Sequence, residues 1–331
     1  MSFRPAGALA TMLALTSVFA ATSLGATDAV PATPNVSATT ERNDYSNPAF
    51  MLPLTAGLKH FYARDFKSAE ADFDAALHAV PDNTLAISFF NAAAAQQQGE
   101  LEVVTNVEED AASGAPKNYV NHVRLGFSYL FESSTGRDRT EDAREELNTA
   151  VGLDPDAAAA HVGLGIMRFG DRSANRAKVE LLAALRTDPS NVLAREYLGE
   201  LYQADLRDPE RGLQYVIDVP NLVPGYADIQ FHIGSLLSDL GQPDAAITYL
   251  ERGIALDSAH VGEAGQHGYT LIARIELQQH KVKEATAVLN AAVDADVDTI
   301  YAKALLAKIK NGDYDRAAST SDVPTPEPTG S

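Results

Sequence analysis

Three alternating aspartates, Asp294, Asp296 and Asp298, are the first residues whose type and spacing could do chemistry. Carboxylates at alternate positions are typical of the start of a calcium-binding loop, which needs Gly at its sixth position and Glu at its twelfth. Here those positions hold Thr299 and Leu305, so the calcium interpretation fails. We expect these aspartates to lie in a turn between helices, with Asp298 capping the helix that follows.

The other residues that could do chemistry do not form a known motif. His260 and His267 flank a glycine-containing loop, but a metal site there needs further ligands, and none is obvious in the sequence. The chain contains no His-Glu-x-x-His, no Gly-x-Ser-x-Gly, no phosphate-binding glycine loop and no dinucleotide fingerprint. The absence of cysteine excludes disulfides, thiolate metal sites and a Cys nucleophile. We therefore predict no enzymatic activity, no cofactor and no metal.

Charge narrows the class of partner. The 331 residues include 26 Lys and Arg against 45 Asp and Glu, which gives a formal net charge of −19. Phosphate backbones and anionic membrane surfaces both attract proteins with a cationic footprint. The sequence therefore argues against nucleic acid as a partner.

The elements that position these side chains repeat along the chain. Gly165, Gly199 and Gly234 each follow Leu or Ile, and they lie 34 and 35 residues apart. A glycine of this kind starts a longer pattern, in which a small residue, a large apolar residue, a second small residue and a closing proline follow it. Three units carry the whole pattern: Gly57, Ala69, Phe73, Ala76 and Pro81; Gly126, Ala143, Leu147, Ala150 and Pro155; Gly165, Ala177, Leu181, Ala184 and Pro189.

This pattern and its period resemble the tetratricopeptide repeat (TPR) family. The resemblance implies an all-α fold, a right-handed α-solenoid of about seven helix–turn–helix units over residues 50–318. We expect a capping helix near 299–310 and a further helical stretch at 313–318. The second helix of the fifth unit contains Gly212 and Pro220, so we expect it to be short or kinked.

The two ends of the chain have a different composition. A basic start, an apolar middle and a small-residue exit predict a signal peptide over residues 1–26, with cleavage after Ala26 or after Ala20. An uncleaved membrane anchor is the alternative. Residues 27–49 are predicted to be a flexible lead-in and residues 319–331 a disordered, proline-rich tail. These patterns favour an exported protein, soluble in the periplasm or secreted, without stable membrane insertion once the signal is cleaved.

The family resemblance also implies a concave groove lined by the first helix of each unit. Carried onto this sequence, its N-terminal half is apolar and aromatic: Leu58, Phe61, Tyr62, Phe127, Leu130, Phe131, Ile166 and Phe169. Its C-terminal half is polar and acidic: Glu196, Glu200, Asp228, Asp239 and Arg274. Such a groove could hold an amphipathic helix or extended peptide of a partner, with its basic end on the acidic half. Alternatively, the apolar side chains are internal, covered by residues 27–49, by a second protomer or by tight curling.

Two family positions carry further expectations. A carboxylate clamp of Lys, Arg and Asn is excluded, because Leu54 and Leu58 stand where Lys and Asn are needed. His122 and His161 occupy the place of a large packing residue, so we expect them to be structural.

The sequence predicts a non-catalytic adaptor or scaffold for another protein. The alternatives are an assembly protein that forms a homo-oligomer, and a small-ligand receptor or enzyme that uses the acidic half and His267.

Overall fold

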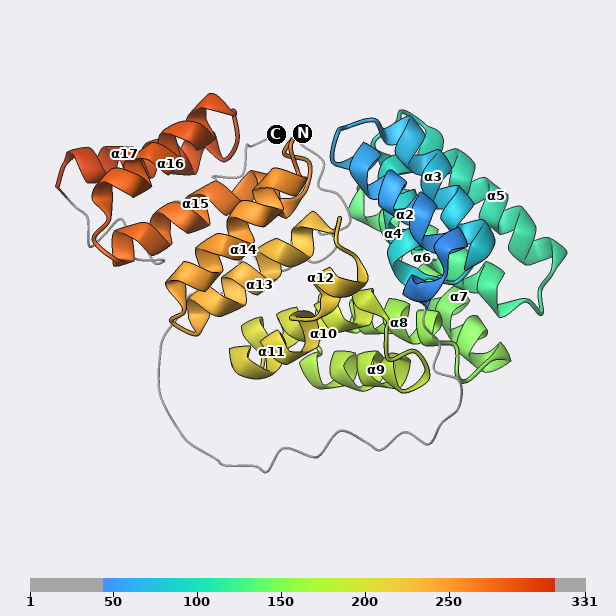
Figure 1. Cartoon of the computed structure of the whole chain (residues 1–331). Coiled ribbons are helices and arrows are strands. Elements are labelled where there is room, and N and C mark those ends of the chain that lie inside the picture. Colours follow the sequence, from blue (N-terminus) through green and yellow to red (C-terminus); the bar gives the residue numbers. More distant parts are fainter. Residues whose placement is uncertain (1–43, 313–331) are drawn as a thin grey trace.

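The computed structural model describes residues 44–312, and every α-helical pair predicted from the repeat pattern is present in that range (Figure 1). The first four units are α2 (Pro48–Phe61) with α3 (Phe66–Ala79), α4 (Thr84–Ala95) with α5 (Glu100–Gly114), α6 (Tyr119–Ser134) with α7 (Thr140–Leu153), and α8 (Ala158–Gly170) with α9 (Ala174–Thr187). The last two are α13 (Ala227–Asp239) with α14 (Pro243–Leu256), and α15 (Glu263–Gln278) with α16 (Val282–Asp294). The capping helix α17 spans Thr299–Lys310, as predicted. The all-α solenoid is thereby confirmed.

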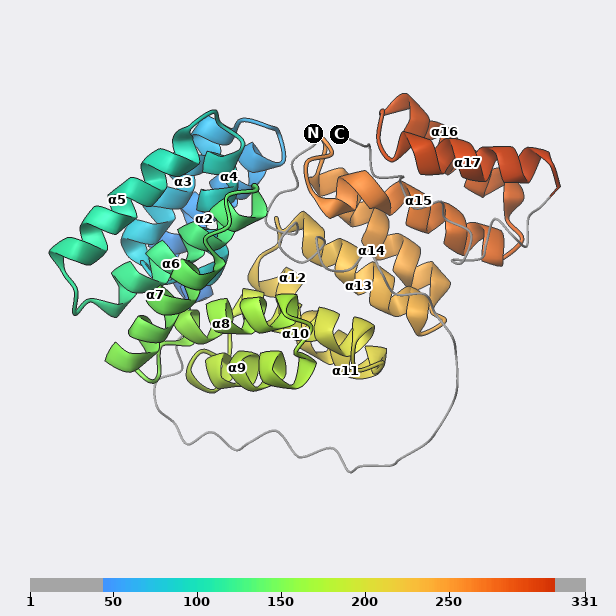
Figure 2. The ribbon, with the colours of Figure 1, turned by 180° about the vertical axis from the view of Figure 1, so that it is seen from behind.

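The fifth unit is irregular, as its sequence predicts. Its first helix, α10 (Val192–Ala204), is ordinary, but its second is split into α11 (Pro209–Val216) and α12 (Val219–Leu222). Pro220 lacks the amide hydrogen that a continuous helix would need, so the chain turns at 217–218 and restarts. After this break α12 lies beside α13, near the centre of both views (Figures 1 and 2).

The predicted lead-in is wrong for residues 44–49. Asp44–Ser46 form a short 3-10 helix (η1), and the buried Asp44 accepts a hydrogen bond of 3.0 Å from Asn83 Nδ2. Helix α2 starts at Pro48. Proline lacks an amide hydrogen, and at the first position of a helix that hydrogen would have no partner within the helix. The predictions for residues 1–26, 27–43, 313–318 and 319–331 lie outside the described residues. Within 44–312, no helix has the length and apolar character needed to cross a membrane.

Close packing explains the small residues in the repeat pattern. A Cβ atom added to Gly165 of α8 would lie 2.7 Å from Leu181 Cδ2 of α9, and one added to Gly57 of α2 would lie 2.6 Å from the Phe73 ring of α3. Real carbon atoms do not approach so closely, since contact between carbons is most favourable at about 3.5–4.0 Å. The glycine therefore lets the two helices of a unit touch, and the large residue fills the space beside it.

The array curls tightly enough to contact itself. Tyr62, which follows α2, donates a hydrogen bond of 3.2 Å to Asp228 Oδ2 on α13, and its carbonyl accepts one of 3.2 Å from the Ala259 amide. Thr84 Oγ1 of α4 donates to Asn191 Oδ1, before α10, at 3.0 Å. One continuous apolar core therefore reaches from α2 to α15, and a second, smaller core lies under α16 and α17.

The packing argument makes a prediction about two glycines. Gly165→Ala should destabilise the protein by about 1–3 kcal/mol, because its methyl group must displace Leu181. Gly152→Ala on α7 is the matched control. Nothing lies within 4 Å of its Cβ position, so it should be neutral or stabilise by up to about 1 kcal/mol. Urea unfolding followed by circular dichroism measures the unfolding free energy of both variants. Equal changes in the two would contradict the role of close packing at Gly165.

Candidate functional site

The eight side chains predicted to line the apolar half of the groove are all buried inside the protein. They are Leu58, Phe61, Tyr62, Phe127, Leu130, Phe131, Ile166 and Phe169. The prediction of an exposed apolar groove at these positions is therefore wrong for this structure. Tight curling of the repeat array, which the sequence left open as an alternative, accounts for their burial.

An aromatic contact shows what covers the apolar side chains. Tyr226, which precedes α13, meets Phe89 of α4 edge to face, with 5.6 Å between ring centroids. Phe89 also meets Phe61 at 5.0 Å and Tyr62 at 6.1 Å. The sixth unit thus closes over the inner helices of the first two units, and these rings fill the middle of the array.

Beside these rings lies a buried acidic cluster, which we define as Glu196 and Glu200 on α10, Asp228 and His232 on α13, Asp257 at the end of α14, and Glu263 on α15. His232 Nδ1 lies 3.2 Å from Glu196 Oε1, and its Nε2 lies 3.1 Å from Glu263 Oε2 and 3.6 Å from Glu200 Oε1. Tyr226 donates a hydrogen bond of 2.6 Å to Glu196 Oε2.

The sequence had pointed to Glu196, Glu200 and Asp228 but missed the other members of the buried acidic cluster. His232 follows Asp228 by four residues on α13, a spacing that places both on one helix face, so this signal was present in the sequence. Asp257 and Glu263 flank the loop between α14 and α15. No periodic pattern there could have placed them beside Asp228 and His232.

Burial changes the proton affinity of the cluster. Burial raises the pKa of Asp228 to about 8, and the neighbouring carboxylates of Glu263 and Asp257 add to the rise. Burial likewise raises the pKa of Glu200 to about 8, although His232 opposes it. Burial alone would lower the pKa of His232, but its contacts with Glu196 and Glu263 outweigh that and raise it well above the usual range. The cluster therefore holds protons that exposed carboxylates would have lost.

Asp257 shapes the loop that meets Tyr62. Its carboxylate accepts backbone hydrogen bonds from Val261 and Gly262, both at 2.8 Å, and from Gly265 at 3.1 Å. These bonds fold residues 257–265 around one buried carboxylate. The same fold brings the Ala259 amide to the Tyr62 carbonyl.

A different part of the inner surface keeps access to solvent. We define the polar inner face as Gln203 on α10, Ser235 and Asp239 on α13, and Arg274 on α15, all of which are partly or fully exposed. Gln203 Nε2 donates to Ser235 Oγ at 2.8 Å and to Asp239 Oδ2 at 2.6 Å. Partial burial lowers the pKa of Arg274, while Asp239 opposes the change. Two of the predicted polar residues, Asp239 and Arg274, belong to this face, whereas Glu196 and Asp228 are buried.

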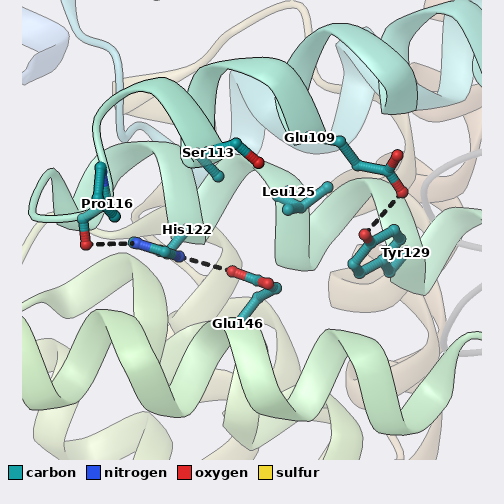
Figure 3. A pocket seen from close by; sticks show the side chains of 8 residues that line it. Glu109, Ser113, Pro116, His122, Leu125, Tyr129 and Glu146 are labelled. Atoms are coloured by element: carbon teal, nitrogen blue, oxygen red, sulfur yellow. Dashed lines mark hydrogen bonds and ion pairs between the residues drawn. The ribbon is translucent and has the colours of Figure 1, made fainter.

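A cavity of about 390 Å³ lies among α5, α6 and α7 (Figure 3). The polar side chains that line this cavity form hydrogen bonds with other protein groups. His122 Nδ1 lies 2.6 Å from Glu146 Oε2 and its Nε2 lies 3.1 Å from the Pro116 carbonyl, while Tyr129 donates to Glu109 at 2.8 Å. His122 therefore joins α6 to α7 through Glu146 and to the loop before α6 through the Pro116 carbonyl.

The contact of His122 recurs in the next units. His161 reaches back six residues to the Pro155 carbonyl at 3.0 Å and across to Glu180 at 2.8 Å. Arg195 stands at the corresponding place and donates to the Pro189 carbonyl at 2.9 and 2.7 Å. The repetition agrees with the structural role expected for His122 and His161.

The remaining candidates for chemistry do not form a site. The prediction that the Asp298 side chain caps α17 is wrong, because it makes no capping hydrogen bond there. Its Oδ2 instead accepts a hydrogen bond of 2.7 Å from Thr270 and lies 3.4 Å from His267 Nδ1, which ties the final turn to α15. Among residues 44–312, no group of three or more His, Asp or Glu side chains is arranged to hold a metal ion.

Comparison with known proteins identifies the repeat. A family model described as tetratricopeptide repeat matches residues 227–260, which comprise α13, α14 and the turn that follows. The same helix pair recurs along the described chain. The chain is a tetratricopeptide repeat protein. No curated protein sequence matches it.

Solved structures of other TPR and TPR-like chains resemble this TPR protein at low identity. The human IFIT1 dimer with m7Gppp-AAAA is 14% identical with a TM-score of 0.54, and the match covers 75% of this chain and 61% of that one. YrrB, described as a TPR protein with an unusual peptide-binding site, is 20% identical with a TM-score of 0.47, and the match covers 60% of this chain and 96% of that one. A TPR protein from Parabacteroides merdae is 17% identical with a TM-score of 0.44 over 82% and 99%. At these identities the likeness shows the fold alone.

The contact between Tyr226 and Glu196 can be tested by removing one hydroxyl group. Tyr226→Phe leaves a buried carboxylate oxygen without its donor, which should cost about 1–3 kcal/mol of unfolding free energy. Tyr249→Phe removes the hydroxyl of a half-buried tyrosine on α14 and serves as the control, with an expected change within about 0.5 kcal/mol. Urea denaturation at neutral pH measures both. A Tyr226→Phe protein as stable as the control would refute the role of this bond.

Proposed function

We propose that this TPR protein is a non-catalytic adaptor or scaffold that binds a segment of another protein on its polar inner face. The observation that carries the proposal is the contrast in exposure along the inner helices. Upstream, the residues of α4 and α8 are buried almost throughout, whereas Gln203, Asp239 and Arg274 from three successive inner helices remain partly or fully exposed. At the groove positions that the family pattern gives, solvent access is therefore kept by Gln203, Asp239 and Arg274 and not by the eight apolar side chains of the N-terminal half.

The chemistry of this face suits a polar peptide segment. Gln203 and Ser235 offer both donors and acceptors for a peptide backbone, and Asp239 and Arg274 offer one charge of each sign. The net charge of −19 favours the approach of a basic segment over long range. It also disfavours a phosphate-rich ligand of the kind present in the IFIT1 complex.

The other functions considered from sequence have less support. Self-association was expected to use an exposed apolar half, and the burial of those residues removes that basis. A receptor or enzyme using His267 is not favoured by any contact of that residue, which packs against Asp298.

Partner capture tests the proposal. Asp239→Arg reverses the charge of an exposed side chain on the polar inner face, whereas Asp110→Arg makes the same change on α5. A protein captured from the native envelope fraction by the wild type and by Asp110→Arg should be lost with Asp239→Arg, with an unchanged helical signal. Capture that survives Asp239→Arg would contradict the assigned face. Charged substitutions at Phe127 or Phe169 would not test binding, because both side chains are buried and the protein would unfold.

We also propose that the protein is exported to the periplasm or outside the cell. The support is the sequence pattern of residues 1–26. N-terminal sequencing of the protein from its native cells should read from Thr27 or from Ala21. A mature protein that retains Met1 in the soluble cytosolic fraction would overturn this proposal.

A further inference from the structure

The contact that closes the array is built on the buried acidic cluster. Tyr62 Oη donates to Asp228 Oδ2, and the Ala259 amide donates to the Tyr62 carbonyl, each at 3.2 Å. Both are bonds between the first unit and the sixth, and Asp228 is completely buried between them. We call this pair of hydrogen bonds the closure contact.

The groups that face Asp228 come from every element packed around it. They are Tyr62 after α2, Glu196 on α10, Tyr226 before α13 and His232 on α13, Asp257 after α14 and Glu263 on α15. Together with Glu200, the cluster gathers five carboxylates around one imidazole. Like charges in a buried space oppose one another, so the cluster is most stable when it retains protons.

We propose that the closure contact is pH-dependent: it holds α2 against α13 while the buried acidic cluster is protonated, and it separates at alkaline pH to uncover Leu58, Phe61 and Tyr62. The inference goes beyond the adaptor role, because it concerns the conformation of the chain itself and requires no partner. The contact would then act as an internal cover on the apolar inner helices.

The direction follows from the titrating groups. The pKa of Asp228 is about 8 in the closed structure against an ordinary 3.8, so its contribution to closure is complete below 3.8 and is lost as the pH rises through about 8. Glu200, about 8 against 4.5, behaves in the same way. His232, whose pKa is raised above 6.5, also loses a more tightly held proton as the pH rises. All three groups therefore favour closure on the acid side.

The Ala259 amide reports opening directly, because its hydrogen bond to the Tyr62 carbonyl is one of the two bonds of the closure contact. Hydrogen exchange of the full-length protein should be followed by mass spectrometry between pH 6 and pH 9, with each rate divided by the intrinsic chemical rate at that pH. Opening admits water to the cluster, so the open state binds fewer protons and becomes more populated as the pH rises. We expect the corrected exchange of the Ala259 amide to rise by about tenfold or more.

Asp228→Asn is the decisive variant, since an amide keeps a hydrogen-bond acceptor for Tyr62 but cannot ionise. Its rise in exchange should be clearly smaller than in the wild type, while Asp110→Asn on the exposed side of α5 should behave like the wild type. Glu200→Gln, at the edge of the cluster where the side chain is 18% exposed, should also reduce the rise and gives a second measurement if Asp228→Asn does not fold. Corrected exchange that is constant from pH 6 to 9, or rises equally in both cluster variants and the wild type, would overturn the proposal. Neither outcome depends on partner capture.

Discussion

The rest of the structure depends on how the inner helices of the first two units are covered. In α4 every residue from Thr84 to Ala94 is buried, including Phe89 and Phe90, so this helix has no face that tolerates water. A repeat array normally buries the contacts between neighbouring units and leaves its inner surface open. Here the sixth unit supplies the missing cover through Tyr226, and the array is closed by contacts between residues far apart in the chain.

Closure places polar groups at the edge of an apolar core. Burying a carboxylate is costly unless it is paired or keeps its proton. The buried acidic cluster combines both solutions: His232 stands beside Glu196 and Glu263, tyrosine hydroxyls donate to Glu196 and Asp228, and Asp257 is held by three backbone amides. The cover over the apolar rings is therefore tied to protonation, while the polar inner face further along α10, α13 and α15 remains accessible.

The sequence predicted the helix pairs and their packing because these depend on neighbours within about 35 residues. The contact between Gly165 and Leu181 follows from their local spacing, and the irregular second helix of the fifth unit follows from Gly212 and Pro220 within it. The closure was not predicted, because Tyr62 and Asp228 are 166 positions apart and curvature accumulates from small rotations in every unit. Phe61 and Phe127 looked like groove residues since the family pattern places them on the inner side, and only the total curvature decides whether that side is open. The ordered position of Asp44 was not predicted for a similar reason, because its partner Asn83 lies in another unit.

The most direct test of the closed array is a disulfide between its first and sixth units. A Cβ atom on Gly225 would lie 3.9 Å from Leu58 Cβ, within the range of about 3.5–4.5 Å that a disulfide requires, and the natural chain has no competing cysteine. The double variant Leu58→Cys with Gly225→Cys should oxidise to one intramolecular bond near neutral pH, seen as faster migration on a non-reducing gel and as no free thiol. Two thiols that stay free in the folded monomer, or that join only separate chains, would contradict the closed array.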